Sequence, residues 1–303
     1  MSLTQFSDPE APVTSIFTKD ELVQAHEDAS TPPQYKAPKH WSEFVGPAVL
    51  FGLFIGFWYF MSYWGLKHIF GKPSFLLTAP HVVIRDSFMK WVNTKPLLEA
   101  LWLSTQVALV GLVIAIALGV LLAILMSQAS WIEKSVWPYL VAVQAIPILA
   151  FVPLIGNIYG FNFRSRVIVC VIIALFPIVA NTLFGLLSAE RGQHDLFTLR
   201  GASRWTRLRK LQLPAAMPAI FAGFRIAAGL SVIGAVVGDT FFRQGEPGIG
   251  ILIDQYRSRL NNPVMYGAVI LAALLGILFF VIFGWIGRRV IGSWHETTRK
   301  TTN

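Results

Sequence analysis

The sequence predicts an all-α fold, a polytopic membrane helical bundle with six transmembrane helices. The composition is the first reason: 54% of the 303 residues are hydrophobic and 14% are charged, whereas about a quarter of the residues are charged in soluble domains. The mean hydropathy is +0.58. The second reason is length, because six apolar stretches each reach the roughly 20 residues that cross a bilayer as a helix. The third is one long charged stretch, residues 190–214, between two of these spans.

The six predicted spans divide the chain into a membrane domain, residues 45–290, and two polar tails, residues 1–44 and 291–303. The first tail lacks the apolar core of a cleaved secretory signal, and we assign it no chemistry. Arg225 is the one charged residue within the spans. The spans are Val45–Leu66, Ala100–Met126, Val136–Phe163, Val167–Ala189, Pro214–Val237 and Pro263–Gly287.

Basic residues orient the bundle, since Lys and Arg accumulate in cytoplasmic loops. With six spans, both termini lie on one side of the membrane. Placing them inside gives the cytoplasm the larger share of Lys and Arg, including the dense cluster at 191–210 and the pair Arg288 and Arg289. The net charge of +9 is best explained by anionic lipid and soluble partners and not by nucleic acid, because no aromatic platform accompanies the basic residues.

Two outer segments have the apolar periodicity of helices that lie along a membrane surface. The first is Pro80–Asn93, whose stripe is Ile84, Phe88 and Trp91. The second is Ile249–Leu260, whose stripe is formed by Ile249, Leu252, Ile253, Tyr256 and Leu260. We expect both stripes to pack against the rim of the bundle, and the alternative is a contact with substrate.

The charged stretch 190–214 has the pattern of two short helices joined by a turn. The first helix has a short apolar face and ends before Gly201, a residue suited to the left-handed C-cap conformation. Ser203 is placed to cap the second helix, and Pro214 suits the first turn of the next membrane helix. The apolar residues are Leu196, Phe197 and Leu199 on the first helix, and Trp205, Leu208 and Leu211 at three-residue intervals on the second.

A helical hairpin with an apolar ridge is suited to insertion into a groove on a partner protein. An ordinary positive-inside loop would explain the arginines of this stretch, but not its glycine, its ridge and its Leu213–Pro214 ending together. We therefore interpret 190–214 as a partner-docking hairpin on the cytoplasmic side.

Polar residues and prolines in the other spans are candidates for a pathway or gate. Proline frees a backbone carbonyl and is tolerated beside other helices or a water-filled cavity, so a pore-lining kink and simple helix packing both remain open for the third and fourth spans. Gln144, Pro147 and Pro153 interrupt the third span and Asn157 follows them, while Pro177 and Asn181 lie in the fourth. Cys170 lies within the fourth span too, and we expect a small buried residue there and no redox or metal role.

Two charged residues of the fifth helix are sharper candidates. Arg225 lies within the span, where an ionisable group is costly and usually faces the interior of a bundle, although snorkelling toward the cytoplasm or packing explains it as well. Asp239 lies just past the outer end of the helix, where an i,i+4 pair with Arg243 is the plain interpretation. Gating or contact with a binding protein is the alternative for Asp239.

The residues of the hairpin carry a family resemblance. The spacing of Asp195, Gly201, Leu211 and Leu213–Pro214 resembles the EAA motif of the permease subunits of ATP-binding-cassette (ABC) importers. The segments 214–230, 234–239 and 248–253 resemble the nitrate, sulfonate and taurine branch of that family. The resemblance covers roughly residues 80–290, and it departs from the family at Asp195, where glutamate is usual, and at Leu196 and Phe197, where two alanines are usual.

The resemblance implies a type I-like ABC importer fold, in which residues 45–290 form a transmembrane permease domain and 190–214 form the coupling loop that seats in an ATPase. The chain is then a transport subunit and not an enzyme. It binds no cofactor or metal, and a partner ATPase holds ATP and Mg. The implied ATPase-coupling interface is Asp195, Leu196, Phe197, Gly201, Ala202, Ser203, Arg204, Trp205, Leu208, Leu211, Leu213 and Pro214.

The implied partners are two copies of an ABC ATPase, a second permease chain in a homodimer, an extracytoplasmic substrate-binding protein and membrane lipid. The implied location is the inner or plasma membrane, with multiple passes and both termini in the cytoplasm. The pathway or gate candidates are Gln144, Pro147, Asn157, Asn181, Arg225 and Asp239.

The cargo that the resemblance implies is a small anionic solute such as nitrate, a sulfonate or taurine, or a vitamin precursor. Basic residues on the outer side are able to attract an anion; they are Arg164, Arg166, Arg243, Arg257 and Arg259. The alternatives are a glycine-betaine permease of the same machinery and, from a different class, a self-contained secondary transporter or channel. The latter needs intramembrane ionisable residues for coupling, and the spans offer little beyond Arg225.

Overall fold

The structure, a computed structural model, describes residues 40–242 and 244–292. The predicted tails up to residue 39 and from 293 onward lie outside the described residues, as does Arg243. The chain divides into two compact units, residues 1–57 and 58–303. Over the described ranges the regular structure is entirely helical, without a strand, which confirms the predicted all-α class.

The first predicted span begins in α2 (His40–Phe60) and continues through a π-helical turn, η2 (Met61–Gly65), into α3 (Leu66–His68). Within the second unit, two hydrogen bonds join the first residues of the unit to the segment 77–78. The Trp58 Nε1–H donates to the Thr78 carbonyl at 3.0 Å, and the Ser62 hydroxyl donates to the Leu77 carbonyl at 2.6 Å. A short 3-10 turn, η3 (Ser74–Leu76), precedes these acceptors.

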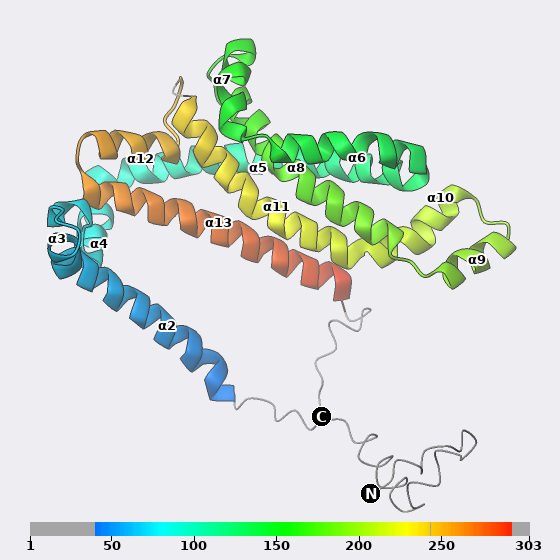
Figure 1. Cartoon of the computed structure of the whole chain (residues 1–303), viewed down its shortest axis with the longest axis horizontal. Helices are drawn as coiled ribbons and strands as arrows, with labels where there is room; N and C mark the ends of the chain where they lie inside the picture. The colour runs from blue at the N-terminus through cyan, green and yellow to red at the C-terminus, as the bar shows by residue number, and fades with distance from the viewer. Residues whose placement is uncertain (1–39, 243, 293–303) are drawn as a thin grey trace, which may run out of the picture. The chain divides into compact units, whose positions relative to one another are not determined.

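Four long helices form the core of the second unit: α5 (Trp91–Gln128), α8 (Phe163–Leu187), α11 (Leu213–Phe241) and α13 (Asn262–Ile291). The helix α11 packs against the other three (Figure 1). The predicted buried cysteine, Cys170 on α8, is confirmed as fully buried. A side chain on Gly111 would place its Cβ 2.4 Å from the Cys170 Cβ, and one on Gly234 would lie 2.8 Å from the Cys170 Cα, so these glycines let α5 and α11 approach α8 closely.

The third predicted span is not a single helix. It is divided into α6 (Ser130–Ala145) and α7 (Ile148–Tyr159), whose axes differ in direction by 97°. Ile146 is extended, with φ −75° and ψ 130°, because a residue that precedes proline is disfavoured in the helical region. Of the two prolines expected to interrupt this span, Pro147 breaks it, whereas Pro153 lies inside α7.

The two predicted surface helices are present as α4 (Pro80–Phe88) and α12 (Ile249–Ser258). The stripe of α12 packs as expected, with Ile249 and Leu252 buried against α5 and α13, although Leu260 lies beyond the helix and is exposed. The predicted packing face of α4 is only partly right: Phe88 is half-buried beside Gly267 of α13, whereas Ile84 and Trp91 are exposed and Trp91 begins α5.

The buried face of α4 is instead formed by Pro80, Val83 and Ser87. The Ser87 hydroxyl donates to the Pro263 carbonyl at 3.0 Å, and a Cβ on Gly267 would lie 2.2 Å from the Ser87 oxygen. A small polar residue thus sets the packing of α4 on α13, which an apolar periodicity does not reveal.

Among the described residues, five helices are long and apolar enough to cross a membrane, and the count is six if the bent pair α6 and α7 is one span. The predicted six-span bundle is therefore supported, with its third member broken.

Candidate functional site

The first arm of the hairpin is α9 (Arg191–Leu199), and it ends at the predicted glycine. Gly201 has φ +64°, its N–H donates to the Thr198 carbonyl at 2.9 Å, and the Ala202 N–H donates to the Phe197 carbonyl at 3.0 Å. These two bonds are those of a Schellman motif, in which a left-handed residue satisfies the last carbonyls of a helix. The predicted C-cap is confirmed.

The second arm begins with α10 (Arg204–Arg207), and Ser203 is its N-cap as predicted. The Ser203 hydroxyl oxygen accepts a hydrogen bond from the Thr206 N–H at 3.2 Å. The two arms are joined directly, because the Arg207 Nη2–H donates to the Thr198 hydroxyl on α9 at 3.0 Å. The turn is thereby fixed on both of its sides.

The second arm is not a separate short helix, as the sequence had suggested. It passes through a π-helical turn, η4 (Leu208–Gln212), into α11 (Leu213–Phe241), so residues 204–241 form one continuous helical run. Proline lacks the N–H of a normal helical bond and its ring clashes with the carbonyl four residues earlier. The wider π turn lies directly before Pro214 and accommodates this defect.

The predicted apolar ridge of the second arm is divided between surface and interior. Trp205 is 68% exposed, whereas Leu208 is 2% exposed and lies in a core cluster with Leu186 and Ile220. Leu208 therefore anchors the hairpin and is not part of a docking surface. The exposed apolar surface consists of Trp205 together with Leu196 (53%) and Leu199 (86%) on α9.

The other predicted coupling residues are distributed around this surface. Asp195, Gly201, Ser203, Arg204 and Pro214 are exposed, while Phe197, Ala202, Leu211 and Leu213 are half-buried. Exposed apolar side chains such as these are available for contact with a protein or a membrane. The role of these residues in coupling stays a prediction.

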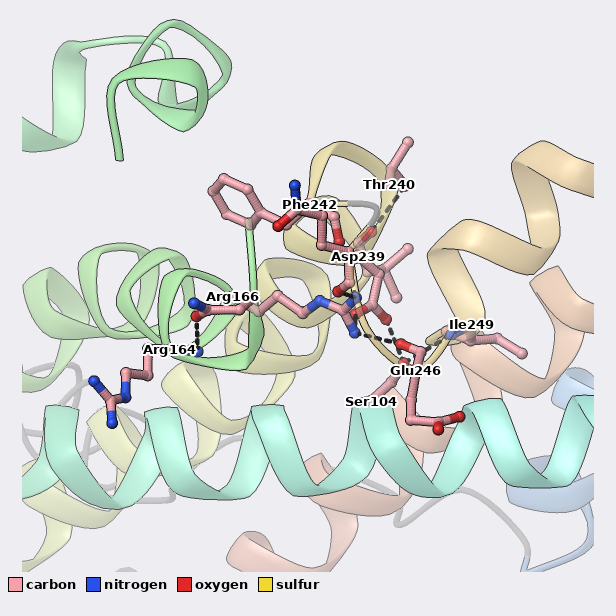
Figure 2. Close-up of polar contacts among 11 residues, drawn as sticks. Ser104, Arg164, Arg166, Asp239, Thr240, Phe242, Glu246 and Ile249 are labelled. Carbon is pink, nitrogen blue, oxygen red and sulfur yellow. Dashed lines mark hydrogen bonds and ion pairs between the residues drawn. The ribbon is translucent and has the colours of Figure 1, made fainter. Parts of the chain in front are cut away.

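At the other end of α11, a buried ion pair joins two of the long helices (Figure 2). The Arg166 Nη1 of α8 lies 3.1 Å from the Asp239 Oδ1 of α11, with side chains 2% and 0% exposed. The same guanidinium donates to three backbone carbonyls, those of Phe242 at 2.8 Å, Gln244 at 3.1 Å and Glu246 at 3.1 Å. The Arg166 side chain thus holds the loop that follows α11.

The second carboxylate oxygen of Asp239 connects this ion pair to α5 and α12. It accepts a short hydrogen bond from the Ser104 hydroxyl, whose oxygen accepts from the Ile249 N–H at 2.8 Å. A Cβ on Gly248 would lie 2.0 Å from this carboxylate oxygen, so the loop approaches Asp239 as closely as only glycine allows. We call Ser104, Arg166, Asp239, Phe242 and the backbone of 244–249 the ion-pair cluster.

This cluster corrects two predictions from the sequence. Asp239 lies inside α11 and is fully buried, not past the helix end, and its ion partner in the described part of the chain is Arg166. Arg166 had been counted among the anion-attracting arginines of the outer surface, and its burial removes it from that set. No periodic pattern indicates a pair separated by 73 positions, although a buried charge in a span calls for a partner of opposite sign.

The remaining pathway candidates are not brought together in one cavity. Gln144, Pro147 and Asn157 are exposed on α6, α7 and the break between them. Asn181 donates to the Pro177 carbonyl at 2.8 Å and lies where α8 meets Gly223 of α11, an ordinary packing position.

Arg225 is half-buried and packs against α13. Its guanidinium carbon lies 3.8 Å from the centroid of the Phe280 ring of α13, a cation–π contact, and a Cβ on Gly284 would lie 3.2 Å from its Nε. The packing interpretation of Arg225 is therefore supported. In the described part of the chain, no group of His, Cys, Asp and Glu is arranged to hold a metal ion.

The sequence of this chain is similar to that of a known protein family. Residues 115–292, more than half of the chain, match the family of binding-protein-dependent transport system inner membrane components. The chain belongs to this family. The permease is thus a multi-pass membrane protein and a transport component, as its helical spans indicated.

Two relatives are 30% identical or more over most of the permease. The formylaminopyrimidine transport permease protein ThiX of Halalkalibacterium halodurans is 32% identical over 223 residues, which cover 73% of this chain and 86% of the relative. The riboflavin transport system permease protein RibX of Chloroflexus aurantiacus is 30% identical over 221 residues, covering 73% and 81%. The nitrate import permease protein NrtB of Leptolyngbya laminosa is 27% identical over 249 residues, covering 82% and 88%.

Solved structures share the fold of the permease. A chain of the MetNI methionine ABC transporter in an inward-facing conformation aligns with a TM-score of 0.52 at 21% identity, covering 67% of this chain and 97% of its own. A chain of an amino acid ABC transporter crystallised with histidines aligns with a TM-score of 0.51, covering 67% and 98%. These alignments confirm the predicted ABC importer fold.

Proposed function

We propose that this permease forms the translocation pathway of an ATP-driven importer and takes its energy from a separate ATPase that seats on the hairpin 190–214. The observation that carries the proposal is the shape of the hairpin. A Schellman turn at Gly201 presents Leu196, Leu199 and Trp205 to solvent, and the second arm continues without interruption into α11. A partner seated on this surface acts directly on a helix that crosses the bundle.

The chemistry of ATP hydrolysis belongs to that partner. The sequence contains no Gly-x-x-x-x-Gly-Lys-[Ser/Thr] phosphate loop, whose backbone N–H groups and lysine would hold the phosphates of a nucleotide. ATP and Mg are therefore assigned to the ATPase. An external binding protein and a second copy of this permease complete the proposed machine, with both termini of the permease in the cytoplasm.

We propose a small heteroaromatic vitamin or vitamin precursor as the cargo. Two relatives at 30% identity or more are named for formylaminopyrimidine and riboflavin transport. A cavity of about 320 Å³ beside the ion-pair cluster is lined by Trp102, Gln106, Glu99 and Glu246, among others. A tryptophan face and hydrogen-bonding groups suit a planar aromatic amine, whereas two carboxylates disfavour an anion.

The argument for an anionic cargo from the outer arginines is weakened in the described residues. Arg166 is buried in the ion-pair cluster, and Arg257 lies 2.6 Å from the Asp254 carboxylate. Arg164 and Arg259 are exposed. A nitrate or sulfonate permease and a glycine-betaine permease are thus the lesser alternatives.

The coupling role is tested by replacing Gly201 with valine in the complex reconstituted with its ATPase and binding protein. A side chain in the left-handed conformation costs about 1–2 kcal/mol, so the hairpin turn distorts, and we expect ATP hydrolysis stimulated by the binding protein to fall about 5- to 30-fold. Gly71 is the matched control, since it has φ +60° with open space around it and lies outside the hairpin. Equal stimulation in the Gly201→Val and Gly71→Val complexes would contradict the coupling role.

The cargo is tested in the same vesicles by measuring ATP-dependent uptake of labelled formylaminopyrimidine, riboflavin, nitrate and glycine betaine. We expect uptake of one of the two heteroaromatic compounds and little of the others. Uptake of nitrate or glycine betaine alone would reject the proposed cargo while leaving the coupling role intact.

A further inference from the structure

A second polar site lies inside the hairpin, away from the exposed apolar surface. It is a cavity of about 230 Å³ between the end of α5, the first arm α9 and the start of the second arm. Every side chain that lines it is polar, and none is a carboxylate. The lining residues are Ser127, Gln128, His194, Arg204, Arg207 and Gln212.

The two arginines of this cavity have no carboxylate partner. Among the described residues, the ion pairs involve neither Arg204 nor Arg207. Arg207 uses its Nη2 to donate to Thr198, but its Nε is buried and has no acceptor. A buried donor without a partner is costly, most of all on a charged group, and buried polar groups in folded proteins are almost always satisfied.

One amide of the cavity, that of Gln212, is left with a free donor. The Gln128 Nε2–H donates to the Gln212 side-chain carbonyl at 3.3 Å and to the Ser127 hydroxyl at 3.1 Å. Since the carbonyl oxygen of Gln212 is engaged in this way, its amide nitrogen remains as the donor. Gln212 is 7% exposed, so this arrangement is inside the protein.

We propose that this cavity binds a small oxyanion of the phosphate class. A guanidinium group matches the oxygens of a phosphate and forms charge-assisted hydrogen bonds to them, which are stronger than neutral ones. One liquid water occupies about 30 Å³, so the cavity has room for an ion with several oxygens and not only for a bridging water. The absence of a carboxylate in the lining rules against a cation.

An anion bound in this cavity contacts several helices at once. Its walls come from α5, α9, α10 and η4, so a bound anion cross-links both arms of the hairpin to the end of a core helix. Binding itself does not depend on the proposed transport function. The consequence for transport rests on that function: a hairpin stiffened by the anion responds less readily to its partner.

The proposal is tested by anion titration of the purified permease in nanodiscs of zwitterionic lipid, with thermal unfolding followed by tryptophan fluorescence. Phosphate or sulfate is expected to raise the midpoint relative to chloride at equal ionic strength. Arg207→Gln is expected to weaken the apparent affinity tenfold or more, since it removes the charge-assisted bonds. Arg209→Gln makes the same charge change on an exposed neighbour outside this cavity and is expected to keep the response.

Two further experiments distinguish the possible results. Gln212→Glu places a carboxylate in the cavity, so the protein without phosphate is expected to gain stability and to lose the phosphate response, a result that a folding defect in Arg207→Gln does not imitate. Nanodiscs with added phosphatidylglycerol distinguish a lipid headgroup from a free anion: protection by this lipid alone, lost in Arg207→Gln, identifies the oxyanion as that of the headgroup. No response to phosphate, sulfate or the anionic lipid, or an equal response in Arg207→Gln, would overturn the proposal.

Discussion

The buried ion pair of Arg166 and Asp239 shows how a single charged residue acquires its role from its partner. Arg166 satisfies three loop carbonyls as well as Asp239, and Asp239 in turn accepts from Ser104. A buried pair of charges adds little net stability when it is intact, but the loss of one partner leaves an uncompensated charge. The cluster therefore specifies how α5, α8, α11 and α12 meet at this end of the molecule.

Replacement of Arg166 by methionine is expected to destabilise the permease by about 3–5 kcal/mol, because Asp239 stays buried without its counter-charge. The double variant Arg166→Met with Asp239→Leu is expected to recover much of this loss, since no charge is then left unpaired. Unfolding in detergent, measured for the wild type, both single variants and the double variant, gives the coupling between the two positions. Arg164→Met, two positions away and exposed, is the control.

Additive losses in the double variant would contradict this account. They would mean that Arg166 acts through the loop carbonyls alone and that its contact with Asp239 has no energetic weight.

At the scale of elements, some residues of the hairpin anchor it in the core and others are exposed to solvent. Gly201 and Ser203 fix the turn, as their residue types predicted. The three-residue spacing of Trp205, Leu208 and Leu211 predicted one shared face, but Leu208 lies one turn nearer to α11 than Trp205, where Leu186 and Ile220 surround it. As a result Leu208 enters the core while Trp205 stays in solvent.

This division predicts opposite effects for two alanine substitutions. Leu208→Ala is expected to cost about 2–5 kcal/mol of stability, because it leaves a cavity between Leu186 and Ile220. Trp205→Ala is expected to change stability by less than about 0.5 kcal/mol and to weaken binding of the ATPase by about 2 kcal/mol, or roughly 30-fold, as for a buried interface tryptophan. The measurements are thermal unfolding of the permease alone and its affinity for the purified ATPase. Full affinity in Trp205→Ala would place the docking surface elsewhere.

Other elements show why the sequence predicted the presence of the helices better than their breaks and their packing faces. Long apolar runs predicted the spans, because hydrophobic length is a direct signal of a transmembrane helix. The direction change between α6 and α7 depends on a single proline, whose effect as a kink or as a complete break is decided by packing. The face of α4 was mispredicted in part, because its closest contact with α13 is made by Ser87 and Gly267 and, of the apolar stripe, only Phe88 is half-buried beside them.

At the scale of the whole molecule, the membrane orientation is still a prediction from the distribution of Lys and Arg. It can be tested with the natural cysteine left in place, since Cys170 is fully buried and is expected to be unreactive. Gly192→Cys on α9 is expected to resist a membrane-impermeant maleimide in intact cells and to react after permeabilisation, whereas Gln255→Cys on α12 is expected to react in intact cells. The reverse pattern would place the hairpin outside and exclude an ATPase on it.

The family could be predicted from the hairpin residues alone, because the spacing of Gly201, Leu211 and Leu213–Pro214 reflects a local geometry. The ion-pair cluster could not, because it joins residues from four elements that no local pattern connects. Sequence reasoning thus reached the hairpin and singled out Asp239, but it did not identify Arg166 and Ser104 as the partners of Asp239.

The continuous helix from Arg204 to Phe241 has one more consequence. Its 38 residues, at a rise of about 1.5 Å each, make a rod about 57 Å long that begins in the hairpin turn and ends beside Asp239. Such a rod works as a lever: a tilt of about 5° about one end displaces the other by about 5 Å. Under the proposed function, a tilt of this rod imposed by a partner at Trp205 is transmitted over its whole length and strains the Arg166–Asp239 ion pair at the far end.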